Sequence, residues 1–129
     1  MRRLCLGIAL LAPVLLAVVR LRRFQRWAVS GASMSPALQP GDWLLVERLG
    51  PGSRQPSPGE IVLVPDPREP SRVLIKRLVR LEPGGLAWLE GDNPPASTDS
   101  RHFGPVPVAS VKGVVRYRYW PPRRAGKPV

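Results

Sequence analysis

The first candidate for chemistry is a serine inside a run of small residues. Ser33 lies in the segment SGASMSP, which begins at Ser30 and ends at Pro36. Small residues let the backbone turn tightly and leave an N–H group free to point at a bound carbonyl oxygen. Such a turn can present a nucleophile, but most turns of this composition carry no chemistry. The run alone leaves both interpretations open.

A serine nucleophile needs a base, and arginine does not deprotonate in proteins. This excludes all but three of the 20 Lys and Arg residues. Lys127 lies in the C-terminal tail, between a glycine and a proline. Lys112 alternates with Arg116 and Arg118, and this spacing places all three on the solvent face of a strand. We therefore expect both of these lysines to be exposed.

Lys76 differs from the other lysines because it lies between Leu74 and Leu78 on one face of a predicted strand whose other face is also apolar. Burial disfavours the charged ammonium and lowers the pKa of a lysine, so that it can accept a proton near neutral pH. The alternative is a lysine that is ion-paired or that reaches the solvent with its amine. His102 is the only histidine, and we expect it at the surface.

The segment of residues 91–106, GDNPPASTDSRHFGPV, concentrates polar side chains between a predicted strand and an aromatic residue. If residues 97–101 are extended, Ser97, Asp99 and Arg101 share one face and can orient a buried amine. Asp92 lies at the start of the same segment. The alternative is an ordinary polar loop, whose exposed Asp/Arg pair would contribute under about 1 kcal/mol.

The elements that must position these residues are predicted to be strands. The 17 prolines and 12 glycines break the body into short pieces, and no long helical periodicity appears after the N-terminus. Apolar segments bounded by turn residues predict strands at 42–47, 60–64, 72–81, 86–90 and 111–120. We therefore expect a mainly β domain over residues 27–120, a small antiparallel barrel or sandwich, followed by a basic, Pro-rich tail at 121–129.

The N-terminus carries an apolar, uncharged segment at residues 4–19 with arginines on both sides. As a helix it would span about 24 Å at about 1.5 Å per residue, and flanking arginines can reach the headgroups. We expect residues 1–26 to form a single-pass transmembrane anchor. The alternatives are a cleaved signal peptide and a buried core helix. Taken alone, the distribution of arginines would keep the body in the cytoplasm.

The composition excludes a disulfide and most kinds of metal site. The single cysteine, Cys5, excludes an intramolecular disulfide and a multi-cysteine metal site, and a single histidine removes most others. We expect neither a metal nor a cofactor.

The net charge of +11, with tryptophans and tyrosines interleaved with arginine, also fits a small β-barrel that binds nucleic acid or anionic lipid. Such a module has no need of a buried lysine and a serine turn.

Five segments, taken in order, resemble the signal peptidase I family of Ser/Lys membrane proteases. They are SGASMSPAL, GDWLLVER, PGEIVLV, VLIKRLVRLEPGG and GDNPPASTDSRHFGPV, and the resemblance covers about residues 29–120. Each segment alone is a weak signal, whereas the ordered set is specific. By position, the resemblance implies that Ser33, followed by Met34, is the nucleophile and that Lys76 is the general base.

The resemblance also implies supporting roles for the polar segment. Ser97 would orient the lysine, and Asp99 with Arg101 would form a supporting ion pair. The oxyanion hole would combine the Ser33 N–H with a donor just upstream. Many relatives have a serine where this chain has Gly31, so the second donor is expected from a backbone N–H or from Ser30. Ala37 also replaces the usual threonine.

The implied function is removal of signal peptides or propeptides from precursor proteins bound as extended peptides. The implied partners are these precursors and a lipid bilayer, with the body outside the cytoplasm and no nucleic acid. Among subgroups, the chain looks most like the small proteases that mature nickel-type superoxide dismutase. Mitochondrial inner-membrane peptidases and minimal bacterial signal peptidases share the same segments. LexA-type repressors use a similar dyad but lack the GDN segment and the N-terminal apolar segment.

Overall fold

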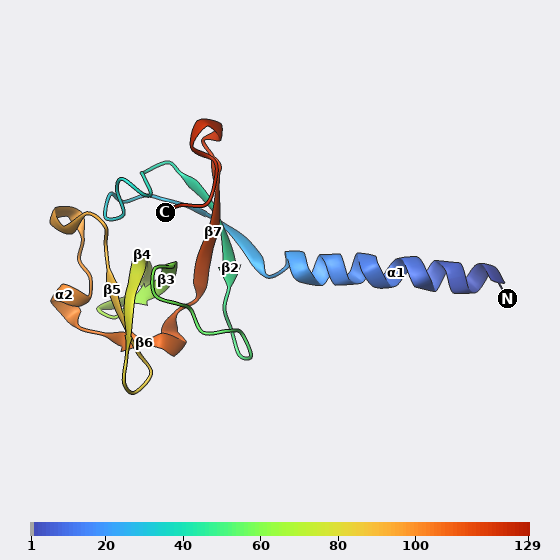
Figure 1. The fold of residues 1–129 in the computed structure, drawn as a ribbon, viewed down its shortest axis with the longest axis horizontal. Coiled ribbons are helices and arrows are strands. Elements are labelled where there is room, and N and C mark those ends of the chain that lie inside the picture. Colours follow the sequence, from blue (N-terminus) through green and yellow to red (C-terminus); the bar gives the residue numbers. More distant parts are fainter. Residues whose placement is uncertain (1) are drawn as a thin grey trace.

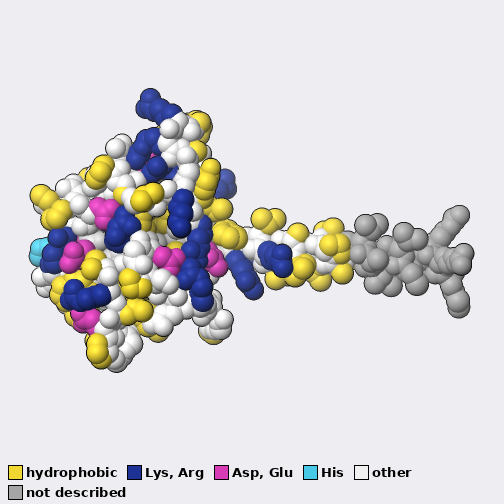
Figure 2. All heavy atoms as spheres, in the orientation of Figure 1, with side chains coloured by type: hydrophobic (Ala, Val, Ile, Leu, Met, Phe, Trp, Pro, Cys, Tyr) yellow, Lys and Arg dark blue, Asp and Glu magenta, His cyan; other side chains and the backbone are white. Residues whose placement is uncertain are grey.

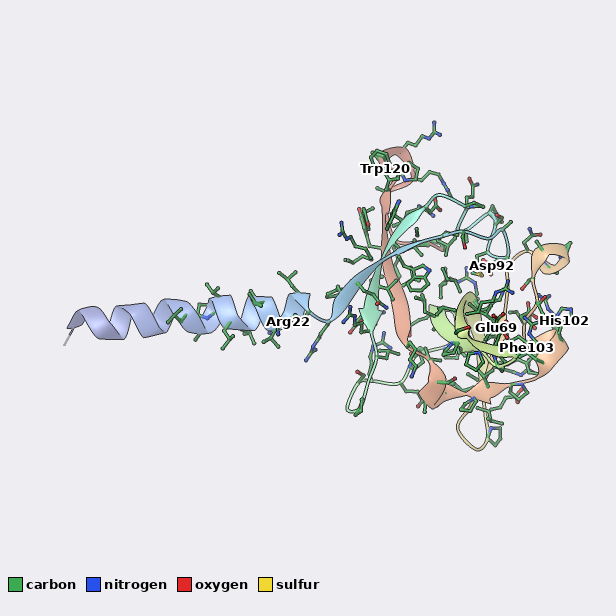
Figure 3. The ribbon with its side chains drawn as sticks, turned by 180° about the vertical axis from the view of Figure 1, so that it is seen from behind. Arg22, Glu69, Asp92, His102, Phe103 and Trp120 are labelled. Atoms are coloured by element: carbon green, nitrogen blue, oxygen red, sulfur yellow. The ribbon has the colours of Figure 1, made fainter. Side chains whose placement is uncertain are left out.

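The computed structural model describes residues 2–129, with side chains described from Leu11 onward. The helix α1 (Arg2–Leu21) projects as a rod from one side of a β body (Figure 1). Basic side chains gather where α1 meets this body (Figure 2), and Arg22 lies at the junction (Figure 3). Within residues 2–129, no helix is both long enough and apolar enough to cross a membrane. The transmembrane helix expected at residues 4–19 is thus not found.

Seven strands form one antiparallel sheet in the order β1-β2-β7-β3-β4-β5-β6. They are β1 (Phe24–Ala28), β2 (Trp43–Arg48), β3 (Ile61–Asp66), β4 (Glu69–Glu82), β5 (Leu86–Glu90), β6 (Val106–Pro107) and β7 (Gly113–Trp120). The mainly β prediction is confirmed, but the sheet is not closed into a barrel. Its ends are β1 and the two-residue β6, whose Pro107 has no N–H to donate to a further strand.

Short helical elements connect the later strands: η1 (Pro94–Ala96), α2 (Ser100–Phe103), η2 (Val108–Ser110) and η3 (Pro122–Arg124). All five predicted strands are present, and β5 has the predicted bounds, while β4 is longer than predicted. Two strands were missed. β1 begins directly after an arginine cluster, so the alternation of its side chains between the two faces was not recognised. β6 has only two residues, which is too few to show an alternating pattern.

The core lies on both faces of β3, because the curled sheet and its loops cover each side. Val62 and Val64 pack with Leu78 and Leu89 in one apolar cluster. The two β3 residues that alternate with these, Ile61 and Leu63, pack into a second apolar cluster. The other members of this cluster include Met34, Leu38, Leu44 and Val115. Four consecutive buried residues in β3 are therefore required by its central position. The second cluster also fixes the turn that carries Ser33, through Met34.

The two faces of β7 differ from the prediction. Tyr117 and Tyr119 are exposed, whereas Arg116 and Arg118 are partly buried in ion pairs with Glu47, Glu60 and Asp42. The pairing of β2 with β7 contains two register shifts, and such irregularities change which face a side chain takes. The prediction that Arg116 and Arg118 lie on the solvent face together with Lys112 was therefore wrong. Lys112 itself lies before β7 and is exposed, as predicted.

The Pro-rich tail returns to the body. Arg118 and Gly126 exchange two backbone hydrogen bonds of 2.8 and 2.9 Å. Arg124 forms an ion pair of 2.6 Å with the buried Asp42, just before β2. The tail thus helps to hold the chain segment that follows the Ser33 turn.

Candidate active site

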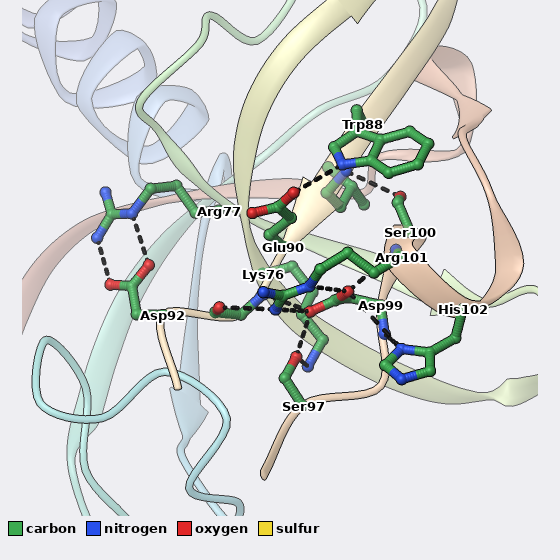
Figure 4. A network of polar contacts seen from close by, with 12 residues as sticks. Lys76, Arg77, Trp88, Glu90, Asp92, Ser97, Asp99, Ser100, Arg101 and His102 are labelled. Atoms are coloured by element: carbon green, nitrogen blue, oxygen red, sulfur yellow. Dashed lines mark hydrogen bonds and ion pairs between the residues drawn. The ribbon is translucent and has the colours of Figure 1, made fainter. Parts of the chain in front are cut away.

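Lys76 lies in the middle of β4, and its side chain is buried, with 3% exposed. Its Nζ donates a hydrogen bond of 3.1 Å to Ser97 Oγ, as Figure 4 shows. Burial lowers the pKa of Lys76 below its ordinary value. The Asp99 carboxylate opposes this shift, and the positive charges of Arg72 and Arg101 add to it. The predicted burial of this lysine is confirmed.

The Asp99 carboxylate organises the neighbours of this lysine. Its side chain is fully buried, and it accepts hydrogen bonds from Ser97 Oγ at 2.6 Å and from the Gly91 N–H at 2.8 Å. Arg101 adds a bidentate pair, with distances of 3.0 and 2.6 Å. Burial alone would raise the pKa of Asp99, but the hydrogen bonds from Arg101, Gly91 and Ser97 hold it well below its usual range. The carboxylate is therefore ionised at neutral pH.

The backbone that brings Arg101 to Asp99 is helical, so the condition of an extended segment at residues 97–101 is not met. Asp99 is the N-cap of α2, where it accepts the Arg101 N–H at 3.1 Å, so Arg101 lies in the first turn of a short helix. His102 Nδ1 accepts the Asp99 N–H at 3.3 Å, completing a capping box. The His102 side chain is 56% exposed, as predicted for a surface histidine.

A second ion pair lies beside the lysine. Arg77, which follows Lys76, forms two hydrogen bonds of 2.9 and 2.7 Å with the Asp92 carboxylate. It also donates to the Gly59 carbonyl at 2.8 Å. The pair raises the pKa of Arg77 and ties β4 to the segment after β5. Asp92 was expected to support the site, but its partner was not predicted.

The Ser33 turn meets this network at Gly91. A Cβ atom added to Gly91 would lie 2.2 Å from Ser97 Oγ and 2.6 Å from the Ser33 carbonyl oxygen, so only glycine fits there. The next residues hold the turn directly, because Asn93 donates its N–H to the Ser33 carbonyl at 2.9 Å. Within residues 2–129, the Ser33 hydroxyl makes no direct hydrogen bond to Lys76. The two groups are brought to one region through Gly91 and Ser97.

Ser33 also lines a surface pocket of about 180 Å³. Ser30 and Gly31, the two candidates for the second oxyanion donor, line the same pocket. The other lining residues are Arg72 and six residues with apolar side chains: Trp27, Ala28, Val29, Met34, Val73 and Ile75. A peptide whose carbonyl group reached Ser33 would therefore lie beside this pocket.

Some residues of the site were missed by sequence reasoning. Asn93, Arg77 and Gly91 all make contacts that neither composition nor periodicity singled out. The sequence feature that could have identified Gly91 and Asn93 is the GDN segment directly after a strand. A glycine at such a place indicates that two chain segments approach each other closely. In the described part of the chain, no group of three or more His, Cys, Asp and Glu residues is placed to hold a metal.

Comparisons with known proteins identify the family of the chain. The family model "Signal peptidase, peptidase S26" matches residues 2–84 and 80–120. The chain is 39% identical over 120 residues to the mitochondrial ATP-independent inner membrane protease subunit 1a of Arabidopsis thaliana, covering 76% of this chain and 71% of that protein. It is 33% identical over 111 residues to the mouse mitochondrial inner membrane protease subunit 1, covering 71% and 67%. It is 32% identical over 142 residues to the mouse subunit 2, covering 93% and 80%.

These matches favour a protease over a basic module that binds nucleic acid. The family match covers both the Ser33 turn and β4 with Lys76, and its second part ends with β7. The chain therefore belongs to the signal peptidase family, peptidase S26, and is a serine endopeptidase.

Proposed function

We propose that this protein removes N-terminal signal peptides or propeptides from precursor proteins at a membrane, with Ser33 as nucleophile and Lys76 as general base. The observation that carries this proposal is the buried Lys76, whose pKa is lowered and whose amine contacts Ser97 beside the Ser33 turn. Elsewhere in the described chain, Lys112 and Lys127 lie outside the core. A lysine is buried at such cost only where its neutral form is useful or its charge is compensated.

The hydrogen-bond directions suit a neutral amine. Ser97 donates its hydroxyl hydrogen to the Asp99 carboxylate, so its oxygen accepts an N–H from Lys76. A neutral amine that donates in this way keeps its lone pair for the Ser33 hydroxyl proton. Lys76 would take that proton as Ser33 Oγ bonds to the substrate carbonyl carbon, and would return it to the leaving amine as the C–N bond breaks. Water would then hydrolyse the acyl-enzyme.

The substrate backbone would bind along β4. Within the described chain, β3 pairs with residues 73–77 of β4, whereas pairing with β5 begins only at Arg77. Residues 72–76 thus have no ladder partner on the β5 side, next to the pocket that Ser33 lines. A substrate segment can add to such an edge as an extended strand, with alternate side chains entering pockets.

Membrane association is supported by the surface at the N-terminal end. The described part of α1 exposes apolar side chains, among them Leu11, Leu15 and Leu21. Arg26, Trp43, Tyr119 and Trp120 line a pocket at the surface near β1, and tryptophan, tyrosine and arginine are favoured at lipid headgroups. We expect the protein in the membrane fraction of cells, released by detergent, and a variant lacking residues 2–21 in the soluble fraction. A wild-type chain found wholly in the soluble fraction would contradict this part.

Purified variants test the catalytic assignment. Wild type and Ser33→Ala are incubated with a secretory preprotein and, separately, with a precursor of nickel-type superoxide dismutase, which also tests the subgroup suggested by the sequence. Cleavage by wild type and its loss in Ser33→Ala are expected. Lys76→Arg keeps the positive charge but cannot accept a proton, so it should be inactive, whereas Lys112→Arg and His102→Ala should retain activity. A folded, active Lys76→Arg or an inactive, folded His102→Ala would overturn the Ser/Lys assignment.

A further inference from the structure

Asn93 holds the candidate nucleophile turn with two hydrogen bonds, although it is 60 positions further along the chain. It follows β5 and precedes η1. Its backbone N–H donates to the Ser33 carbonyl at 2.9 Å. Its side-chain Nδ2 donates to the Ala32 carbonyl at 3.1 Å. The side-chain bond is the one that a substitution can remove without changing the backbone.

The Ala32 carbonyl and the Ser33 N–H belong to the same peptide group. Because a peptide group is planar, a donor that fixes the direction of its C=O also fixes the direction of its N–H. The Ala32 oxygen accepts a second bond, from the Ser35 N–H at 3.2 Å. Together the two donors hold this peptide plane, and they polarise it so that the Ser33 N–H becomes a better donor.

We propose that Asn93 is a positioning residue, whose side-chain amide aims the Ser33 N–H at the oxyanion formed during peptide-bond cleavage. This inference rests on the proposed function, in which that N–H is an oxyanion donor. Asn93 itself does not touch the substrate. Its place beside Gly91 and Asp92 means that one short segment holds both the Lys76 network and the Ser33 turn.

The electrostatic role and a purely structural role predict different kinetics. An oxyanion donor acts on the transition state, so its misorientation lowers kcat and leaves KM nearly unchanged. The pH profile of the neutral variant Asn93→Ala should also stay in place, because the Asn93 side chain forms no hydrogen bond with Lys76, Ser97 or Asp99 in the described structure. A loosened fold would instead lower the thermal midpoint and raise KM.

The test compares Asn93→Asp, Asn93→Ala and Asn93→Ser with Gln39→Ala, which removes an exposed amide outside the site. Asn93→Asp preserves the shape but replaces the donor with an acceptor. Loss of a direct oxyanion donor costs about 10² to 10³ in kcat, and we expect about a tenfold fall for this indirect one. A peptide aldehyde, whose hemiacetal oxygen occupies the oxyanion position, should bind about tenfold more weakly by the same reasoning. Binding of the cleaved product peptide should not change.

Wild-type kcat and wild-type aldehyde affinity in a folded Asn93→Asp would overturn the inference, as would a fall explained entirely by KM or by unfolded protein. Ser33→Ala and Lys76→Arg are measured in parallel. If both are inactive while Asn93→Asp matches wild type, only the positioning role fails. If Ser33→Ala or Lys76→Arg is fully active, the proposed function fails and the inference fails with it.

Discussion

Lys76 Nζ and Ser97 Oγ, 21 positions apart in the sequence, are joined by a buried hydrogen bond of 3.1 Å. The bond connects β4 to the segment that leads into α2. The Ser97 hydroxyl in turn donates a hydrogen bond to the Asp99 carboxylate, whose charge is compensated by Arg101. A buried amine thus touches a neutral hydroxyl rather than a carboxylate, which keeps the charged form of Lys76 from being strongly stabilised.

Removal of the Ser97 hydroxyl should lower activity more than stability. In Ser97→Ala the amine loses its hydrogen-bond acceptor and the orientation of its lone pair, and general-base catalysis contributes about 10² to 10⁴ in rate. We expect kcat to fall about 10²-fold, with partial recovery in Ser97→Thr, which restores a hydroxyl. Ser53→Ala, in an exposed loop, is the matched control. Unchanged turnover in Ser97→Ala would show that Lys76 is oriented by other contacts.

The lowered pKa of Lys76 fixes the sign of the pH dependence. Activity should rise with pH through this pKa, because only the neutral amine accepts the Ser33 proton. Stability should rise in the same direction. Between the folded pKa and the ordinary lysine pKa of about 10.4, the unfolded chain binds the extra proton, so acidification through this window destabilises the fold.

The measurement is urea unfolding of wild type, Lys76→Met and Lys112→Met at several pH values. Methionine removes the titrating amine and fits a buried site, so Lys76→Met should lose this part of the pH dependence. Lys112 is exposed, and Lys112→Met should behave like wild type. Identical pH profiles for Lys76→Met and wild type would contradict the burial argument.

Gly91 should tolerate no side chain. Alanine at this position would bring a Cβ to 2.2 Å from Ser97 Oγ and 2.6 Å from the Ser33 carbonyl, so backbone segments on both sides must move. Overpacking of this kind costs about 1 to 3 kcal/mol in the free energy of unfolding, and here it also displaces Ser97 from Lys76. Gly50→Ala is the control, since a Cβ there has no atom within 4 Å. Equal stability and activity of the two variants would show that the segment adapts freely.

The two parts of the site differ in how far they could be predicted. The burial of Lys76 followed from alternation with Leu74 and Leu78, because a strand places every second side chain on one face. The strand bounds followed from the proline and glycine boundaries. By contrast, the side-chain contact between Asn93 and Ala32 spans 61 positions and has no periodic signal.

Local backbone geometry explains the remaining differences. Asp99 caps a helical turn, so Arg101 reaches it through the cap rather than along a strand, and the pattern of alternating polar residues was compatible with both conformations. The register shifts between β2 and β7 exposed Tyr117 and buried part of Arg118, and no feature of the sequence marks their positions. Irregular pairing is a tertiary property, whereas alternation is a local one.

The pocket beside Ser33 gives a prediction about the substrate. Small residues are expected at the first and third positions before the cleaved bond, as the resemblance to the signal peptidase family implies. Phenylalanine at either position should abolish cleavage by wild type. Ile75 forms part of the pocket wall, so Ile75→Ala should enlarge it and allow cleavage of a substrate with a larger residue, such as leucine, at one of these positions.

Val79→Ala is the control for the enlarged pocket, because Val79 lies on the same strand, is 40% exposed and does not line the pocket. The ratio of kcat/KM for leucine and alanine substrates separates specificity from a general loss of activity. One methylene in an apolar pocket is worth about 1 to 3 kcal/mol, or about 10- to 200-fold in this ratio. If Ile75→Ala and Val79→Ala gave the same ratio as wild type, the pocket would not select the substrate, and the extended peptide would have to bind along a different edge of the sheet.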